Sequence, residues 1–70
     1  MAASITVLVN DAHIELPAGI TLTAVLDQLG VDGRGTALAQ NGEVAPRSEW
    51  PTTVVAEGDR LEILTVAQGG

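Results

Sequence analysis

The chain ends on two glycines, Gly69 and Gly70, directly after an apolar run typical of a strand. Glycine has no Cβ, tolerates any φ and lets another molecule approach its carbonyl closely. A carboxylate at such an end is a poor electrophile, and it reacts only after activation, typically as an acyl adenylate formed with ATP. Either the glycines are an incidental frayed end, or Gly70 carries the reactive carboxylate and Gln68 and Gly69 thread it into the cleft of another enzyme.

Few other side chains could do chemistry. The chain has no cysteine, and therefore no thiolate nucleophile, thiolate metal site or disulfide. It also has no lysine, which removes Schiff-base chemistry and the usual acceptor for isopeptide chains. His13 and Glu15 lie on one face of an alternating segment, but metal sites need three or four convergent ligands. We therefore expect His13 to be an exposed strand residue and predict no metal site.

Two further patterns are typical of turns. The glycine-rich stretch 30–35 (GVDGRG) lacks the spacing and the lysine of a phosphate-binding loop, and Asp32 would repel a phosphate. We interpret it as a flexible connection and expect no cofactor bound by this chain. Glu57 and Asp59 flank a glycine, which favours a turn over acid–base chemistry. No nucleophile, base and orienting group can be assembled, so the sequence predicts a protein that is not an enzyme.

Size and charge limit the remaining functions. At 70 residues and 7.2 kDa, with 46% hydrophobic residues and almost no aromatics, the chain predicts one small domain with an aliphatic core. The net charge of −6 repels nucleic acid and anionic membranes, which favours neutral or basic protein partners. The start, MAASITVLVN, has no basic residue and only a short apolar segment. We expect a cytoplasmic protein that is monomeric when free.

The first half of the chain predicts a hairpin and a helix. Segments 4–10 and 12–17 alternate apolar and polar residues on either side of an Asn-Asp turn. Thr21 is a suitable N-cap for a helix over 22–29, whose apolar residues recur at helical spacing. Gly30 supplies the left-handed residue that ends it.

The second half predicts further strands. Segment 36–40 is extended before Asn41-Gly42, a strong hairpin signal, and a brief return strand (EVAP), an irregular turn (RSEWP) and a partly extended stretch (TTVVA) follow. A last strand begins at residue 60. This order predicts an α+β protein of the β-grasp type, with a mixed four- to five-stranded sheet and one helix on one face. Residues 1–65 would form the domain, and residues 66–70 a flexible C-terminal Gly-Gly tail that extends about 17 Å.

Two apolar features have a structural and a functional interpretation. Alternation in the first and last strands turns Leu8, Leu64 and Val66 away from the face covered by the helix. They could form an exposed partner-binding patch or be scattered surface aliphatics. Trp50, the sole aromatic residue, is either a lid over the core or an interface anchor. The lid is favoured, because the core has few other large residues.

Three motifs together resemble the sulfur carrier proteins of thiamine biosynthesis, the ThiS family of ubiquitin-like β-grasp proteins. The most specific motif is NGEVAPRSEW, from Asn41 to Trp50, while EGDRLEIL and the final QGG are shared more widely. The resemblance covers essentially the whole chain. Gln40 departs from it, because the family often has Val or Ile there.

The resemblance implies a reaction at the chain's end. A partner of the ThiF or MoeB type, using ATP and magnesium, would adenylate Gly70, and sulfur from a cysteine desulfurase would convert it to a thiocarboxylate. Thiazole synthase would then take this sulfur for the thiazole ring of thiamine. A chain without cysteine could hold sulfur only at its end, which agrees with this function.

Other functions remain open at the level of the sequence. The small sulfur-carrier subunit of molybdopterin synthase has the same fold and tail, but its chains are typically longer and approach the glycines through a Pro-Pro-Val-like segment where this chain has TVAQ. A ubiquitin-like protein modifier is a second alternative, although the lack of lysine argues against chain building. A plain interaction module with incidental glycines is the third.

Overall fold

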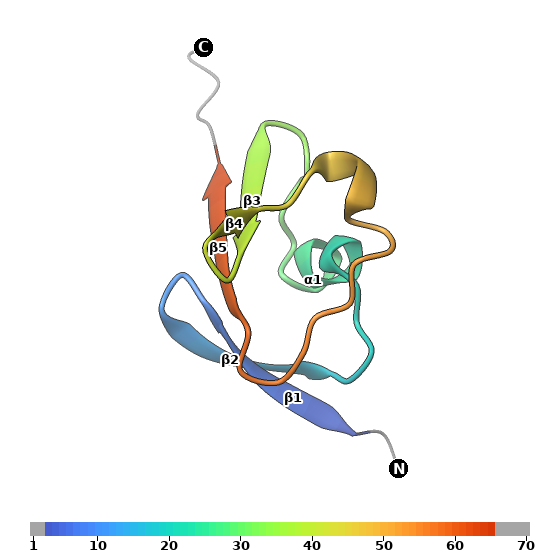
Figure 1. The fold of residues 1–70 in the computed structure, drawn as a ribbon, viewed down its shortest axis with the longest axis vertical. Coiled ribbons are helices and arrows are strands. Elements are labelled where there is room, and N and C mark those ends of the chain that lie inside the picture. The colour runs from blue at the N-terminus through green and yellow to red at the C-terminus, as the bar shows by residue number, and fades with distance from the viewer. Residues whose placement is uncertain (1–2, 66–70) are drawn as a thin grey trace.

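The computed structural model describes residues 3–65, which form a mixed five-stranded sheet with one helix on one face. The elements are β1 (Ser4–Val9), β2 (Ala12–Pro17), α1 (Leu22–Gln28), β3 (Thr36–Gln40), β4 (Glu43–Val44), a 3-10 turn (Arg47–Glu49) and β5 (Arg60–Thr65). The strand order is β2-β1-β5-β3-β4, with β1 and β5 parallel and the other neighbours antiparallel (Figure 1). This confirms the predicted α+β β-grasp, in which the first and last strands are central neighbours.

Two tight turns set the register of the two hairpins. In the β1–β2 turn, Asn10 and Asp11 have φ of 50° and 70°, and in the β3–β4 turn Asn41 and Gly42 have φ of 54° and 85°. Positive φ at both central residues is typical of the type I′ turn, whose twist matches that of the flanking strands. Asparagine and aspartate tolerate this left-handed conformation better than other residues with a Cβ. Both predicted hairpins are therefore confirmed.

The helix begins and ends close to where the sequence predicts. The Thr21 hydroxyl caps its first turn by accepting from the backbone N–H of Ala24 at 3.3 Å. Beyond the last turn, Gly30 has φ of 70° and its N–H donates to Asp27 O at 3.1 Å. The apolar stripe of α1 is buried against the sheet.

The buried core is aliphatic apart from Trp50. Its members are Val7, Val9, Leu16, Ile20, Leu22, Val25, Leu26, Leu38, Trp50, Val55 and Leu61. Trp50 is 5% exposed, and its indole N–H donates to Ala45 O at 2.8 Å, which satisfies its one polar atom. The structure thus supports the lid interpretation of Trp50.

The stretch between the 3-10 turn and β5 is less regular than a strand. It makes one bridge, Thr21 to Val54, and is tied to the start of α1 by hydrogen bonds from Leu22 N to Thr53 O and from Val55 N to Ile20 O. Val55 is buried beneath it while Val54 is 55% exposed. Figure 1 shows this segment closing the same side of the sheet as α1.

Leu61→Ala should lower the free energy of unfolding by about 2–5 kcal/mol, because Leu61 is fully buried and the substitution leaves a cavity. Leu64→Ala is the matched control on the same strand. Leu64 is 69% exposed, so its change should stay within about 0.5 kcal/mol. Urea unfolding of both variants measures this, and equal losses would contradict the assignment of the two faces of β5.

Candidate functional site

The candidate site begins where β5 ends. β5 lies between β1 and β3, so the chain reaches its tail, defined as residues 66–70, from a central strand, as predicted. The proposed tail residues Gln68, Gly69 and Gly70, and the proposed contact residue Val66, lie outside the described residues. The described part of the site is therefore the base from which the tail leaves, with the sheet face beside it.

The end of β5 nearest the tail is held by one asparagine of the β1–β2 turn. The backbone N–H of Ile63 donates to Asn10 Oδ1 at 2.8 Å, and Asn10 Nδ2 donates to Ile63 O at 3.1 Å. The backbone N–H of Asn10 also donates to Leu61 O at 2.9 Å. One residue thus makes three hydrogen bonds to the backbone of β5.

The opposite end of β5 is held by the β3–β4 turn. Asn41 Oδ1 accepts from Arg60 N at 2.9 Å, and Asn41 Nδ2 donates to Asp59 Oδ1 at 3.0 Å. Asp59 Oδ2 accepts from Ala56 N and from Gln40 Nε2, both at 2.9 Å. Gln40, the departure from the family pattern, therefore has a polar partner at the start of β5.

The carboxylates flanking Gly58 act on the backbone of the fold. Glu57 Oε1 accepts from Thr6 N at 3.1 Å. Partial burial raises the pKa of Asp59, but the hydrogen bonds from Ala56, Asn41 and Gln40 together outweigh burial and hold the pKa below its ordinary value. These bonds favour the ionised carboxylate, so Asp59 serves the turn, in agreement with the prediction from sequence.

An exposed apolar patch lies on the sheet face opposite α1, next to the end of β5. Leu64 pairs with Ala37, and Val44 pairs with Ala39, so all four side chains leave the same face. Leu64 is 69% exposed and Val44 is 78% exposed. We call Ala37, Ala39, Val44 and Leu64 the outer-face patch.

The predicted patch residues are only partly brought together. Leu8 is half-buried and lies opposite Arg60, four residues before Leu64 on β5, or about 13 Å along the strand. The polar side chains of Arg60 and Glu62 lie between, so Leu8 flanks the outer-face patch and is not part of it. Val44 was not predicted to be a patch residue, although the two-residue turn at Asn41-Gly42 fixes its register with Ala39.

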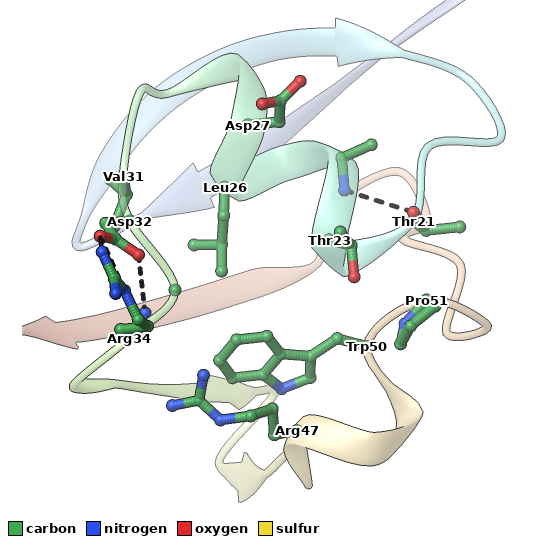
Figure 2. A pocket seen from close by; sticks show the side chains of 12 residues that line it. Thr21, Thr23, Leu26, Asp27, Val31, Asp32, Arg34, Arg47, Trp50 and Pro51 are labelled. Carbon is green, nitrogen blue, oxygen red and sulfur yellow. Dashed lines mark hydrogen bonds and ion pairs between the residues drawn. The ribbon is translucent and has the colours of Figure 1, made fainter.

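A shallow groove lies on the other side of the sheet, between α1 and Trp50 (Figure 2). The Arg47 guanidinium sits 4.9 Å from the centre of the Trp50 ring, and its Nη2 donates to Thr36 O at 3.3 Å. A Cβ on Gly33 would lie 3.4 Å from the Trp50 ring, an ordinary van der Waals contact, so the backbone at Gly33 lies close against the ring. The groove is therefore shaped by the packing of Trp50 and faces away from the outer-face patch.

The glycine-rich stretch 30–35 forms a connection with its own ion pair. Arg34 Nη2 lies 3.2 Å from Asp32 Oδ2. Hydrogen bonds from the Arg34 backbone and side chain, with the charge of its guanidinium, lower the pKa of Asp32. An ionised carboxylate at this position would repel a phosphate.

The described residues contain no cluster that could hold a metal ion. His13 is exposed on β2, and within residues 3–65 no three His, Cys, Asp or Glu side chains converge. No helix of this same part of the chain is long and apolar enough to cross a membrane.

The mixed sheet with a central parallel pair and a single covering helix places the protein in the ubiquitin-like β-grasp class. A family model described as "ThiS family" matches residues 2–70. The chain belongs to the ThiS family.

Similar proteins agree with this assignment. The sulfur carrier protein ThiS of Escherichia coli is 36% identical over 64 residues, which are 91% of this chain and 97% of that protein. A crystal structure of the thiamine biosynthesis protein ThiS from Geobacter metallireducens matches with a TM-score of 0.82 and 28% identity, covering 94% of this chain and all of that one. A thiazole synthase of Paramagnetospirillum magneticum is 36% identical over 63 residues, but this chain spans only 19% of its length.

Asp59→Asn should lower stability by about 1–3 kcal/mol at pH 7, because it removes the charge that Ala56, Asn41 and Gln40 bond to. The pKa of Asp59 is lowered by folding, so its contribution is fully present above the ordinary carboxyl pKa, about 4, and is lost as pH falls through the lower folded value. Urea unfolding measured from pH 6 down to pH 2.5 should show a smaller decrease in the free energy of unfolding for the variant than for the wild type. Parallel curves would contradict this role of Asp59.

Proposed function

We propose that this chain is a sulfur carrier of thiamine biosynthesis, with Gly70 as the residue that carries the sulfur. The observation that carries the proposal is the family match over residues 2–70, together with a sulfur carrier relative that aligns over nearly the full length of both chains. The central position of β5 supports it, because a group at the chain's end would then be presented from a strand with neighbours on both sides.

The proposed chemistry has three steps. A carboxylate oxygen of Gly70 attacks the α-phosphate of ATP, forming the acyl adenylate and releasing pyrophosphate. A persulfide supplied by a cysteine desulfurase attacks the Gly70 carbonyl, a carbon–sulfur bond forms, and AMP leaves. A thiol then reduces the sulfur–sulfur bond, which leaves a thiocarboxylate on Gly70 and oxidises the thiol to a disulfide.

The partners supply the catalysis in this scheme. A ThiF- or MoeB-type adenylating enzyme provides the catalytic groups, ATP and magnesium, and this chain acts as its co-substrate. Gln68 and Gly69 are the narrow segment that threads Gly70 to the nucleotide, since neither is β-branched and glycine has no Cβ. Glu57 and Asp59 of this chain are hydrogen-bonded to backbone N–H groups of its own fold, so we assign the catalytic groups to the partner.

The acceptor in the proposal is thiazole synthase. A protein of that name contains a region 36% identical to 90% of this chain, which links the two sequences. A thiocarboxylate is ionised at neutral pH and nucleophilic through sulfur, so it delivers the atom without releasing free sulfide. The family match favours this function over a molybdopterin synthase subunit or a protein modifier.

We propose that the partners bind the outer-face patch. It lies beside the end of β5, on the face that α1 leaves uncovered, and its two largest side chains are well exposed. Leu8 flanks it and Val66 follows it in sequence. Exposed apolar side chains grouped in this way are typical of protein-binding surfaces.

Incubation with MgATP, the adenylating enzyme and a persulfide donor should raise the intact mass of the protein by the difference between one sulfur and one oxygen atom. A chain lacking Gly70 is the matched control, and it should gain no mass while keeping the same unfolding curve. A mass gain in the truncated chain would place the modification elsewhere and overturn the proposal.

Leu64→Asp should lower kcat/KM for adenylation about tenfold, since a charge in the outer-face patch removes an apolar contact worth roughly 1–2 kcal/mol. Val54→Asp is the control, because Val54 is also an exposed apolar residue but lies in the segment beside α1. It should leave kcat/KM unchanged. Equal effects of both variants would show that the patch has no specific role.

A further inference from the structure

The two edges of β5 are held differently as the strand approaches its end. On the β3 side the pairing continues from Gln40–Leu61 to Thr36–Thr65, the last described residue. On the β1 side the strand pairing stops at Val9–Leu61. β1 ends there because Asn10 enters the turn with φ of 50°.

The side chain of Asn10 continues the hydrogen bonding on the β1 side of β5 as far as Ile63. Its amide has a carbonyl acceptor and an NH₂ donor in one plane, like a peptide group. The acceptor takes the Ile63 N–H at 2.8 Å and the donor reaches Ile63 O at 3.1 Å. A side chain thus replaces the main-chain partner that Ile63 would otherwise lack on this side.

Asn41 offers an internal comparison at the far end of the same strand. It also has a positive φ, at 54°, in a two-residue turn. Its amide oxygen accepts from Arg60 N at the start of β5, and its NH₂ donates to the carboxylate of Asp59, just before the strand. Each asparagine amide therefore ties its turn to β5. They differ in position, because Ile63 lies two residues before Thr65 whereas Arg60 lies at the start of the strand.

We propose that Asn10 is a positioning residue for the sulfur-carrying end: by fixing Ile63, its amide sets the direction in which the chain leaves the sheet toward Gly70. This inference rests on the proposed function, because the direction matters to sulfur loading only if Gly70 is the modified group. Without the amide, the end of β5 is held on one edge only. A partner must then order that end on binding, which weakens association and leaves the bound chemistry unchanged.

Glycine substitutions separate the amide from the turn. Asn10→Gly and Asn41→Gly both keep a residue that accepts positive φ, so neither turn is strained, and each loses one pair of hydrogen bonds. Asn10→Gly should raise the KM of the carrier for the adenylating enzyme about three- to tenfold with kcat nearly unchanged. Asn41→Gly should leave both constants unchanged although it also lowers stability.

Amide hydrogen exchange supplies a readout independent of the partner. In Asn10→Gly, the Ile63 amide should lose protection beyond the change common to the whole fold, while in Asn41→Gly it should follow the rest of the protein. Asn10→Asp keeps the acceptor for Ile63 N–H but places a carboxylate oxygen against Ile63 O where the donor was, so its KM should also rise above that of the wild type. A wild-type KM in this variant would contradict the role of the amide.

Failure of the proposed function and failure of this inference alone would give different results. A wild-type chain that gains no sulfur with active partners overturns the proposed function, and this inference with it. A wild-type chain that is loaded normally, with the same KM in both glycine variants, overturns the inference alone. Unchanged protection of Ile63 in Asn10→Gly would show that the amide does not fix the end of β5.

Discussion

The parallel pairing of β1 with β5 is the constraint on which the rest of the structure depends. It brings the last strand of the domain beside the first, so the chain must cross one face of the sheet between them. α1 and the turn at Trp50 cover that face, while β2, β3 and β4 extend the sheet on either side of the central pair. Parallel central strands are usually well buried, and here Val7, Val9 and Leu61 are buried beneath α1. The strand that leads to the tail therefore has neighbours on both sides.

Because side chains alternate along each strand, one face of the sheet forms the core and the other carries the outer-face patch. Leu38 and Leu61 point into the core, whereas Ala37 and Ala39 on β3 and Leu64 on β5 point to the other face and belong to the outer-face patch. A shift of register by one residue would exchange the two sets. Such a shift would expose Leu38 and Leu61, so the burial that stabilises the fold also keeps the patch on the outside.

Local patterns predicted most of the fold because the relevant physics is local. Apolar spacing, the Thr21 cap and the Asn41-Gly42 turn act over a few residues, and the structure agrees with each. Asn10 was predicted only as a turn former, since its bonds to Ile63 span 53 positions and no short pattern reports them. Val44 was not predicted although the Asn41-Gly42 turn fixes its pairing with Ala39, because that turn does not show which face of the sheet α1 leaves uncovered.

Trp50 has a practical consequence for studying this protein. The chain contains one tryptophan and neither tyrosine nor phenylalanine, and that tryptophan is buried under a guanidinium on the helix side of the sheet. Its ultraviolet emission is therefore a single-site optical signal for the integrity of the body. Because the outer-face patch lies across the sheet, this signal can monitor folding during the chemistry proposed for Gly70 without a label.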